Sequence, residues 1–121
     1  MLRIGEHTVG MEVTELGDRV TKVTLRGRLD TPGVDQIETR FVASLVPGGK
    51  SGIVDLSGVE FVASMGIRML ISVARSMRQR QAKLALYGVP SLVQETFESV
   101  SLSDVIPIGA DETEALHLVS S

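Results

Sequence analysis

One stretch, residues 54–70, constrains the fold more than any other part of the chain. It begins in a run of apolar residues that ends at Leu56 and is typical of a strand buried on both faces. It ends in apolar residues at helical spacing, a pattern that starts at Met65. Ser64 lies directly before this pattern, where the first N–H groups of a helix lack intrahelical partners. The stretch therefore predicts a serine hydroxyl at a helix start, close to a buried strand.

The residues before this stretch predict a β-hairpin followed by a helix. The expected order is a strand at 10–16, a turn at 17–19 and a strand at 20–25, which the segment 27–33 ends. Asp30 or Thr31, ahead of Pro32, is expected to cap the helix. This helix ends before the glycines at 48 and 49, and its apolar face consists of Val34, Ile37, Phe41 and Leu45.

The rest of the chain predicts alternating strands and helices. The expected elements are a core strand at 52–56, a helix at 65–81, a strand at 83–87, a helix from Ser91, a strand at 105–108 and a helix at 111–119. The expected inner face of the helix that starts at Ser91 consists of Leu92, Val93, Thr96, Phe97 and Val100. This order predicts an α/β fold with a mixed, partly parallel sheet of four to five strands and about four helices.

Composition narrows the classes of function. The chain has 121 residues without a shift in composition, so we expect one domain, residues 1–121, with a core from about 10 to 118. It lacks cysteine and has only two histidines, which argues against disulfides, thiolate chemistry and a metal site, and we expect no cofactor. A net charge of −3 argues against binding to nucleic acid, so proteins are the expected partners.

The sequence also lacks the pattern of a membrane segment. Its first residues have no apolar core of a signal peptide, and no run approaches the roughly 20 apolar residues that span a bilayer. We therefore expect a cytoplasmic protein that does not insert into membranes.

We find no pattern typical of an enzyme. The sequence shows no nucleophile paired with a general base, and no pair of carboxylates in a setting that would shift a pKa. Gly49-Lys50-Ser51 is similar to the end of a phosphate-binding P-loop, but it leads into a strand instead of opening a helix. A turn with a solvated lysine explains this segment, and we expect no enzymatic activity.

The helix predicted at 65–81 carries a polar and basic stripe. Its apolar side consists of Ile67, Leu70, Ile71, Ala74 and Met77, and the stripe consists of Ser64, Arg68, Ser72, Arg75 and Gln79. Such a basic face is either solvated or paired with an acidic partner or a phosphate. Met65 and Met69 belong either to the core or to an adaptable contact patch beside Ser64.

Ser64 and Asp30 each have two interpretations. Ser64 is either a helix N-cap, worth about 1 kcal/mol, or an exposed phosphoacceptor. In the second case the helix N-terminus and Arg68, one turn on, would stabilise the phosphate. Asp30 caps the helix that starts near Pro32, contacts a partner, or does both.

Three motifs resemble the STAS-domain anti-sigma factor antagonist family, and the similarity extends from about residue 10 to residue 118. The most specific is Val54-Asp-Leu-Ser-Gly-Val-Glu-Phe-Val-Ala-Ser-Met-Gly-Ile, which resembles the family's strand, its turn and its phosphorylation motif Asp-Ser-Ser/Thr-Gly-Leu. Leu25-Arg-Gly-Arg-Leu-Asp30 is similar to the family's Leu-x-Gly-Glu-Leu-Asp, and Tyr87-Gly-Val-Pro-Ser-Leu-Val resembles the start of its late helix. The resemblance implies a STAS domain with Ser64 at the phosphoacceptor position and Gly66 at the motif glycine.

The chain departs from the family pattern near these motifs. Ala63 stands where the family usually has aspartate, and Met65 where it often has a second serine or threonine. Arg68 replaces a common glycine and Arg28 a common glutamate, which implies a partner with a more acidic surface than usual. A kinase normally brings its own catalytic base, so phosphotransfer does not require the aspartate.

The resemblance implies a partner switch. The unphosphorylated protein would bind an anti-sigma factor, often a serine kinase, and so release a sigma factor for transcription. Phosphate on Ser64 would switch binding off, and a PP2C-type phosphatase would remove it. The implied partner-binding residues are Asp30, Thr31, Ala63, Met65, Gly66 and Arg68.

Two other interpretations remain. In the first, the chain is a STAS module of a phospholipid-transport ATPase or of a signalling scaffold, and Ser64 is only a cap or a docking residue. Alternatively, it is a small nucleotide-binding or hydrolytic protein, which the motifs above argue against.

Overall fold

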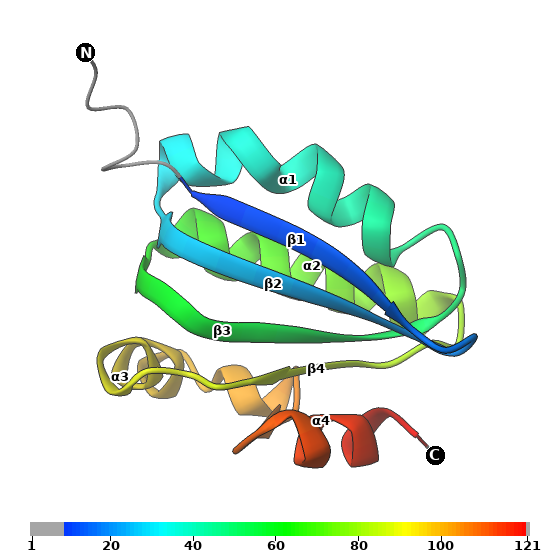
Figure 1. Ribbon diagram of the computed structural model, residues 1–121. Helices are drawn as coiled ribbons and strands as arrows, with labels where there is room; N and C mark the ends of the chain where they lie inside the picture. Colours follow the sequence, from blue (N-terminus) through cyan, green and yellow to red (C-terminus); the bar gives the residue numbers. More distant parts are fainter. Residues whose placement is uncertain (1–8, 121) are drawn as a thin grey trace.

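The computed structural model describes residues 9–120 as a five-stranded sheet flanked by helices (Figure 1). The strands are β1 Gly10–Leu16, β2 Val20–Leu29, β3 Ser51–Val62, β4 Leu84–Tyr87 and β5 Ile108–Gly109. The α-helices are α1 Thr31–Leu45, α2 Ser64–Gln79, α3 Ser91–Ser99 and α4 Glu112–Val119. The strand order is β1-β2-β3-β4-β5, in which only β1 and β2 pair antiparallel. The predicted α/β class with a mixed sheet is therefore confirmed.

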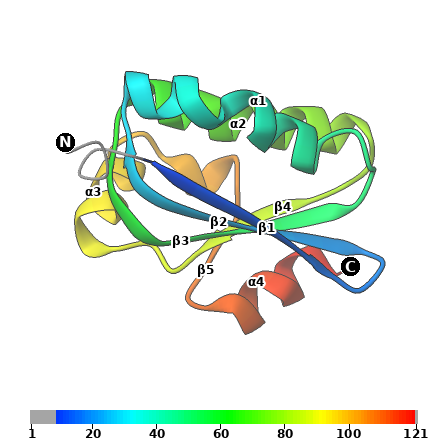
Figure 2. The same cartoon turned by 45° about the horizontal axis from the view of Figure 1, so that its top comes forward.

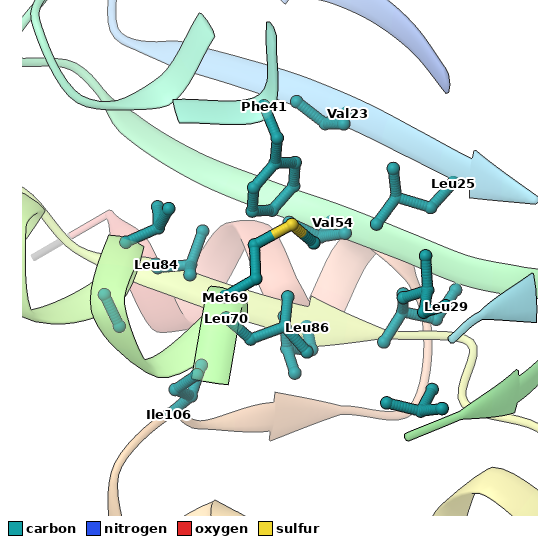
Figure 3. Packing of buried hydrophobic residues seen from close by; sticks show 14 of the residues in the cluster. Val23, Leu25, Leu29, Phe41, Val54, Met69, Leu70, Leu84, Leu86 and Ile106 are labelled. Carbon is teal, nitrogen blue, oxygen red and sulfur yellow. The ribbon is translucent and has the colours of Figure 1, made fainter. Parts of the chain in front are cut away.

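Helices cover both faces of the sheet, and each face has its own apolar cluster. Figure 2 shows α1 and α2 side by side on one face and α4 on the other. Phe41 of α1 and Met69 of α2 point toward each other above Val54 of β3 (Figure 3). Ile53, one residue earlier on β3, faces the opposite side and packs with Ala115 of α4, because successive strand residues alternate between faces. None of the helices in residues 9–120 is long and apolar enough to cross a membrane.

The two long helices follow the predicted apolar patterns, with one shift. The predicted face of α1, from Val34 to Leu45, is buried as expected. In α2 the buried face is centred on Met69 and Val73, so Ile67 and Ile71 are only half-buried. Met69 is a core residue, and Met65 is half-buried against the same core.

Two strands are longer than the sequence predicts. β2 passes through Gly27, which has a φ of +91°, and reaches Leu29, so the predicted break at residues 27–33 is wrong. β3 passes through Ser57 and Gly58 to Val62, six residues beyond the end of the core strand predicted at 52–56. Both strands continue because they pair with each other in parallel, with register shifts that absorb the irregular residues. This pairing is long-range, so local turn chemistry gives no sign of it.

The predictions for the end of the chain need correction. The expected strand at 105–108 is reduced to Ile108–Gly109, because the turn and bend that follow the 3-10 helix Leu102–Asp104 occupy residues 105 and 106. In α3, Val93 and Phe97 are buried, whereas Leu92 is 73% exposed and Val100 is 49% exposed. The short helix α3 therefore presents a narrower apolar face than the predicted one.

A partly buried polar contact attaches α4 to the sheet. The Tyr87 hydroxyl donates a hydrogen bond to Oε1 of Glu112 at 3.2 Å, and Nζ of Lys22 donates to the same oxygen at 2.9 Å. Burial raises the pKa of Tyr87 to about 12, and the negative charge of Asp55 acts in the same direction. The hydrogen bond to Glu112 also raises the pKa of Lys22.

We expect the free energy of unfolding to fall as the pH rises from about 10 toward 12. An unfolded tyrosine loses its proton near pH 10, whereas folded Tyr87 retains it, so alkaline pH favours the unfolded chain. Below about pH 9 this group contributes no pH dependence. Urea unfolding at pH 8, 9, 10 and 11 should show the fall in the native chain and a shallower fall in Tyr87→Phe. Equal slopes for both proteins would contradict the assignment to Tyr87.

Candidate functional site

The strands β2 and β3 end side by side, and each leads directly into a helix. Leu29 of β2 pairs with Val62 of β3, and the Ala63 N–H donates a hydrogen bond to the Leu29 carbonyl oxygen at 3.0 Å. α1 then begins at Thr31 and α2 at Ser64. The two helix starts therefore lie at the same edge of the sheet (Figure 1), and the sequence stretch 54–70 forms one half of this edge.

Gly66 allows the first turn of α2 to lie directly on these strand ends. A Cβ atom at this position would lie 2.9 Å from the Leu29 carbonyl oxygen and 3.0 Å from Cγ1 of Val62. Gly66 itself is buried. The absence of a side chain at Gly66 allows α2 to approach the sheet closely. This close approach fixes the position of Ser64 relative to the ends of β2 and β3.

Ser64 is the first residue of α2, and the expectation that it is the N-cap is wrong. The N-cap residue is Ala63, which has an extended backbone with φ −92° and ψ 176° and makes no side-chain cap hydrogen bond. Its carbonyl oxygen already accepts hydrogen bonds from the N–H groups of Gly66 at 2.9 Å and Ile67 at 3.1 Å, so the helix starts one residue earlier than predicted. The Ser64 side chain is exposed, and its hydroxyl has no hydrogen-bond partner within residues 9–120. The hydroxyl is therefore accessible to chemical modification.

Asp30 is the N-cap of α1, which confirms one of its two interpretations. Its Oδ1 accepts a hydrogen bond from the Gly33 N–H at 2.9 Å, and its Oδ2 accepts one from Nε of Arg28 at 3.3 Å. The Gly33 hydrogen bond and the Arg28 charge hold the pKa of this carboxyl below its usual value. Thr31, the next residue, is exposed at the first position of α1.

Arg28 and Phe61 form a neighbouring pair that the sequence analysis did not single out together. They are cross-strand partners on β2 and β3, and the Arg28 guanidinium lies 4.4 Å from the centre of the Phe61 ring. Phe61 is 40% exposed, which is unusual for a phenylalanine, and an aromatic ring with a cation on its face suits a contact surface. The sequence would have indicated this pair only if β3 had been predicted to extend to Val62, because that length places Phe61 opposite Arg28.

The remaining predicted site residues lie along the first turns of α2. Met65 is half-buried against the core, whereas Arg68 is exposed one turn beyond Ser64. No carboxylate within residues 9–120 forms an ion pair with Arg68. The structure thus brings Asp30, Thr31, Ala63 and Ser64 to one edge, with Arg68 on the adjoining helix face.

A family model described as the STAS domain matches residues 12–115. The chain belongs to the STAS domain family. The chain is 29% identical over 91 residues to BtrV of Bordetella bronchiseptica, assigned as an anti-sigma factor antagonist, covering 75% of this chain and 78% of BtrV. It is 26% identical over 106 residues to the anti-sigma-B factor antagonist of Listeria monocytogenes, covering 88% of this chain and 93% of that protein.

Solved structures of STAS domains have the same architecture. The anti-sigma factor antagonist domain protein of Planctomyces limnophilus superposes with a TM-score of 0.76 at 26% identity, covering 89% of this chain and 95% of that chain. The predicted resemblance to the STAS-domain anti-sigma factor antagonist family is therefore confirmed.

Proposed function

We propose that this STAS domain is an anti-sigma factor antagonist that acts by partner switching. Its unphosphorylated form binds an anti-sigma factor, often a serine kinase, and so releases a sigma factor. Phosphorylation of Ser64 ends this binding, and a PP2C-type phosphatase restores it. The observation that carries the proposal is the exposed Ser64 hydroxyl, which has no hydrogen-bond partner within residues 9–120 and stands at the start of α2.

The charge of a phosphate gives the switch its physical basis. A phosphoserine adds roughly 1.5 to 2 negative charges at neutral pH. At a contact surface this charge imposes repulsion and desolvation costs unless the partner supplies cations. Ser64 is exposed beside Asp30 and Thr31, so a partner that covers this edge would have to cover the phosphate as well.

Ala63 changes how the helix start would accommodate the phosphate. An aspartate at the N-cap, like Asp30 in α1, accepts a hydrogen bond from a first-turn N–H group. Ala63 has no side-chain acceptor, so the first N–H groups of α2 remain available to a phosphate on Ser64. We therefore propose that the phosphate takes over the capping role that the missing aspartate would otherwise have.

A capture experiment tests the binding role and separates it from the alternative. The immobilised protein is expected to retain an anti-sigma factor or a GHKL-type kinase from a lysate of its own host, identified by mass spectrometry. Recovery of an ABC-type ATPase in its place would contradict the proposal and favour a STAS module of a phospholipid-transport ATPase. Incubation of the recovered kinase with ATP and the protein should then add one phosphate, and peptide mapping should locate it on Ser64. Modification of Ser57 or Ser72 would contradict the site assignment.

A further inference from the structure

A shallow, largely open groove of about 510 Å³ lies along the exposed side of α2 and begins one turn after Ser64. All of its lining comes from this one helix: Arg68, Ile71, Ser72, Arg75, Ser76 and Gln79. Ile71 is half-buried and supplies an apolar contact, while Arg68 and Arg75 are exposed. The groove thus combines one apolar position, Ile71, with an arginine on each side of it.

Several cations elsewhere in the described residues are paired with a carboxylate, whereas the two arginines of this groove are not. Lys22, Arg26, Arg28 and Lys50 each form an ion pair with a carboxylate. Arg68 and Arg75 form neither an ion pair nor a hydrogen bond within residues 9–120. The chain as a whole has a net charge of −3, so these two guanidinium groups are a local positive patch on an acidic protein. Such a patch favours an acidic partner.

We propose that this groove binds an acidic amphipathic helix of the partner protein. Arg68 and Arg75 are seven residues apart, which corresponds to two helical turns and about 10.5 Å along the axis. Carboxylates seven residues apart on a partner helix have the same spacing, and an apolar residue between them would contact Ile71. The inference rests on the proposed function and names the chemistry of the partner surface.

The same groove shares a cation with the proposed switch. Arg68 follows Ser64 by four residues, so the two side chains lie on one face of α2, one turn apart. A phosphate on Ser64 would attract the Arg68 guanidinium and withdraw it from the partner helix. Phosphorylation therefore weakens the groove contact as well as repelling the acidic partner.

A synthetic helix tests the groove without the natural partner. The probe is a peptide of about 14 residues, roughly four helical turns, with two glutamates seven residues apart and a leucine between them on the same face. In ¹H–¹⁵N NMR titrations we expect it to shift the amide signals of residues 67–79. A peptide with lysine in place of every glutamate should not bind. Arg68→Gln and Arg75→Gln should each weaken binding about threefold, and the double variant about tenfold, in line with exposed charge pairs.

Matched variants separate the groove from general charge effects. Arg80→Gln removes an exposed cation just past the end of α2 and outside the groove, so it should leave the affinity unchanged. Ser64→Asp should weaken peptide binding relative to Ser64→Asn, and this difference should shrink in the Arg68→Gln background. Equal binding of both peptides, shifts confined to other elements, or full affinity of the double arginine variant would overturn the inference.

The outcomes distinguish this inference from the proposed function. If the protein captures an anti-sigma factor but the acidic peptide does not shift α2, the groove inference fails and the antagonist role stands. If the peptide binds in the groove but no anti-sigma factor or GHKL-type kinase is captured, the groove stands and the proposed function fails.

Discussion

Replacing Gly33 with alanine is expected to lower the free energy of unfolding by about 3 kcal/mol, at the upper end of typical overpacking costs. Gly33 lies in the first turn of α1, and a Cβ atom there would overlap the carbonyl oxygen of Arg28. The obstacle is backbone and cannot rotate away, so the start of α1 has to move. Helix propensity alone would make alanine more stabilising than glycine by about 1 kcal/mol. A loss of stability in Gly33→Ala would therefore have to come from the steric overlap.

Gly48→Ala is the matched control for this substitution. A Cβ atom at Gly48 would have nothing within 4 Å, so we expect a change of no more than about 0.5 kcal/mol. Urea unfolding followed by circular dichroism measures both variants. Equal stability of Gly33→Ala and the native chain would show that α1 starts elsewhere, and that Asp30 and Thr31 are not held beside Ser64 as described.

Ser64→Asp is expected to weaken binding of the anti-sigma factor by about a hundredfold, which corresponds to about 2.7 kcal/mol. The carboxylate places a negative charge at the start of α2, where the proposed partner surface is acidic. Ser64→Ala should bind with nearly native affinity, because the hydroxyl has no hydrogen bond within residues 9–120 to lose. Isothermal titration calorimetry with the purified anti-sigma factor measures both values.

Thr113→Asp provides the control for added charge. Thr113 is exposed in the first turn of α4, on the face of the sheet opposite α2, so its replacement adds the same charge at a comparable helix position (Figure 2). We expect native affinity for this variant. Similar losses for Ser64→Asp and Thr113→Asp would mean that net charge, and not the position of Ser64, controls binding.

The sequence predicted the elements that depend on local signals. Asp30 and Pro32 marked the start of α1, and the periodic apolar residues identified the buried face that includes Phe41. Cap chemistry and helical periodicity act within a few residues, so they can be recognised without knowledge of the fold.

The parts that could not be predicted depend on pairing between distant segments. Ser57 and Gly58 have turn chemistry, yet β3 continues through them because β2 supplies hydrogen bonds from residues 26–29. The contact between Arg28 and Phe61 follows from this strand register, and the pattern of apolar residues along the sequence does not predict it. A difference of one residue at the start of α2 decided whether Ser64 caps the helix or stands free. Sequence patterns do not locate the first residue of a helix to within one residue.

The affinity of the anti-sigma factor for phosphorylated and unphosphorylated protein tests the central claim most directly. The two forms should be prepared from one batch with the captured kinase, and intact mass and peptide mapping should establish a single phosphate on Ser64. The partner-switch account predicts that phosphorylation raises the dissociation constant at least about a hundredfold. It also predicts that phosphatase treatment restores the original value. Equal affinity of the two forms, with Ser64 fully phosphorylated, would contradict the account.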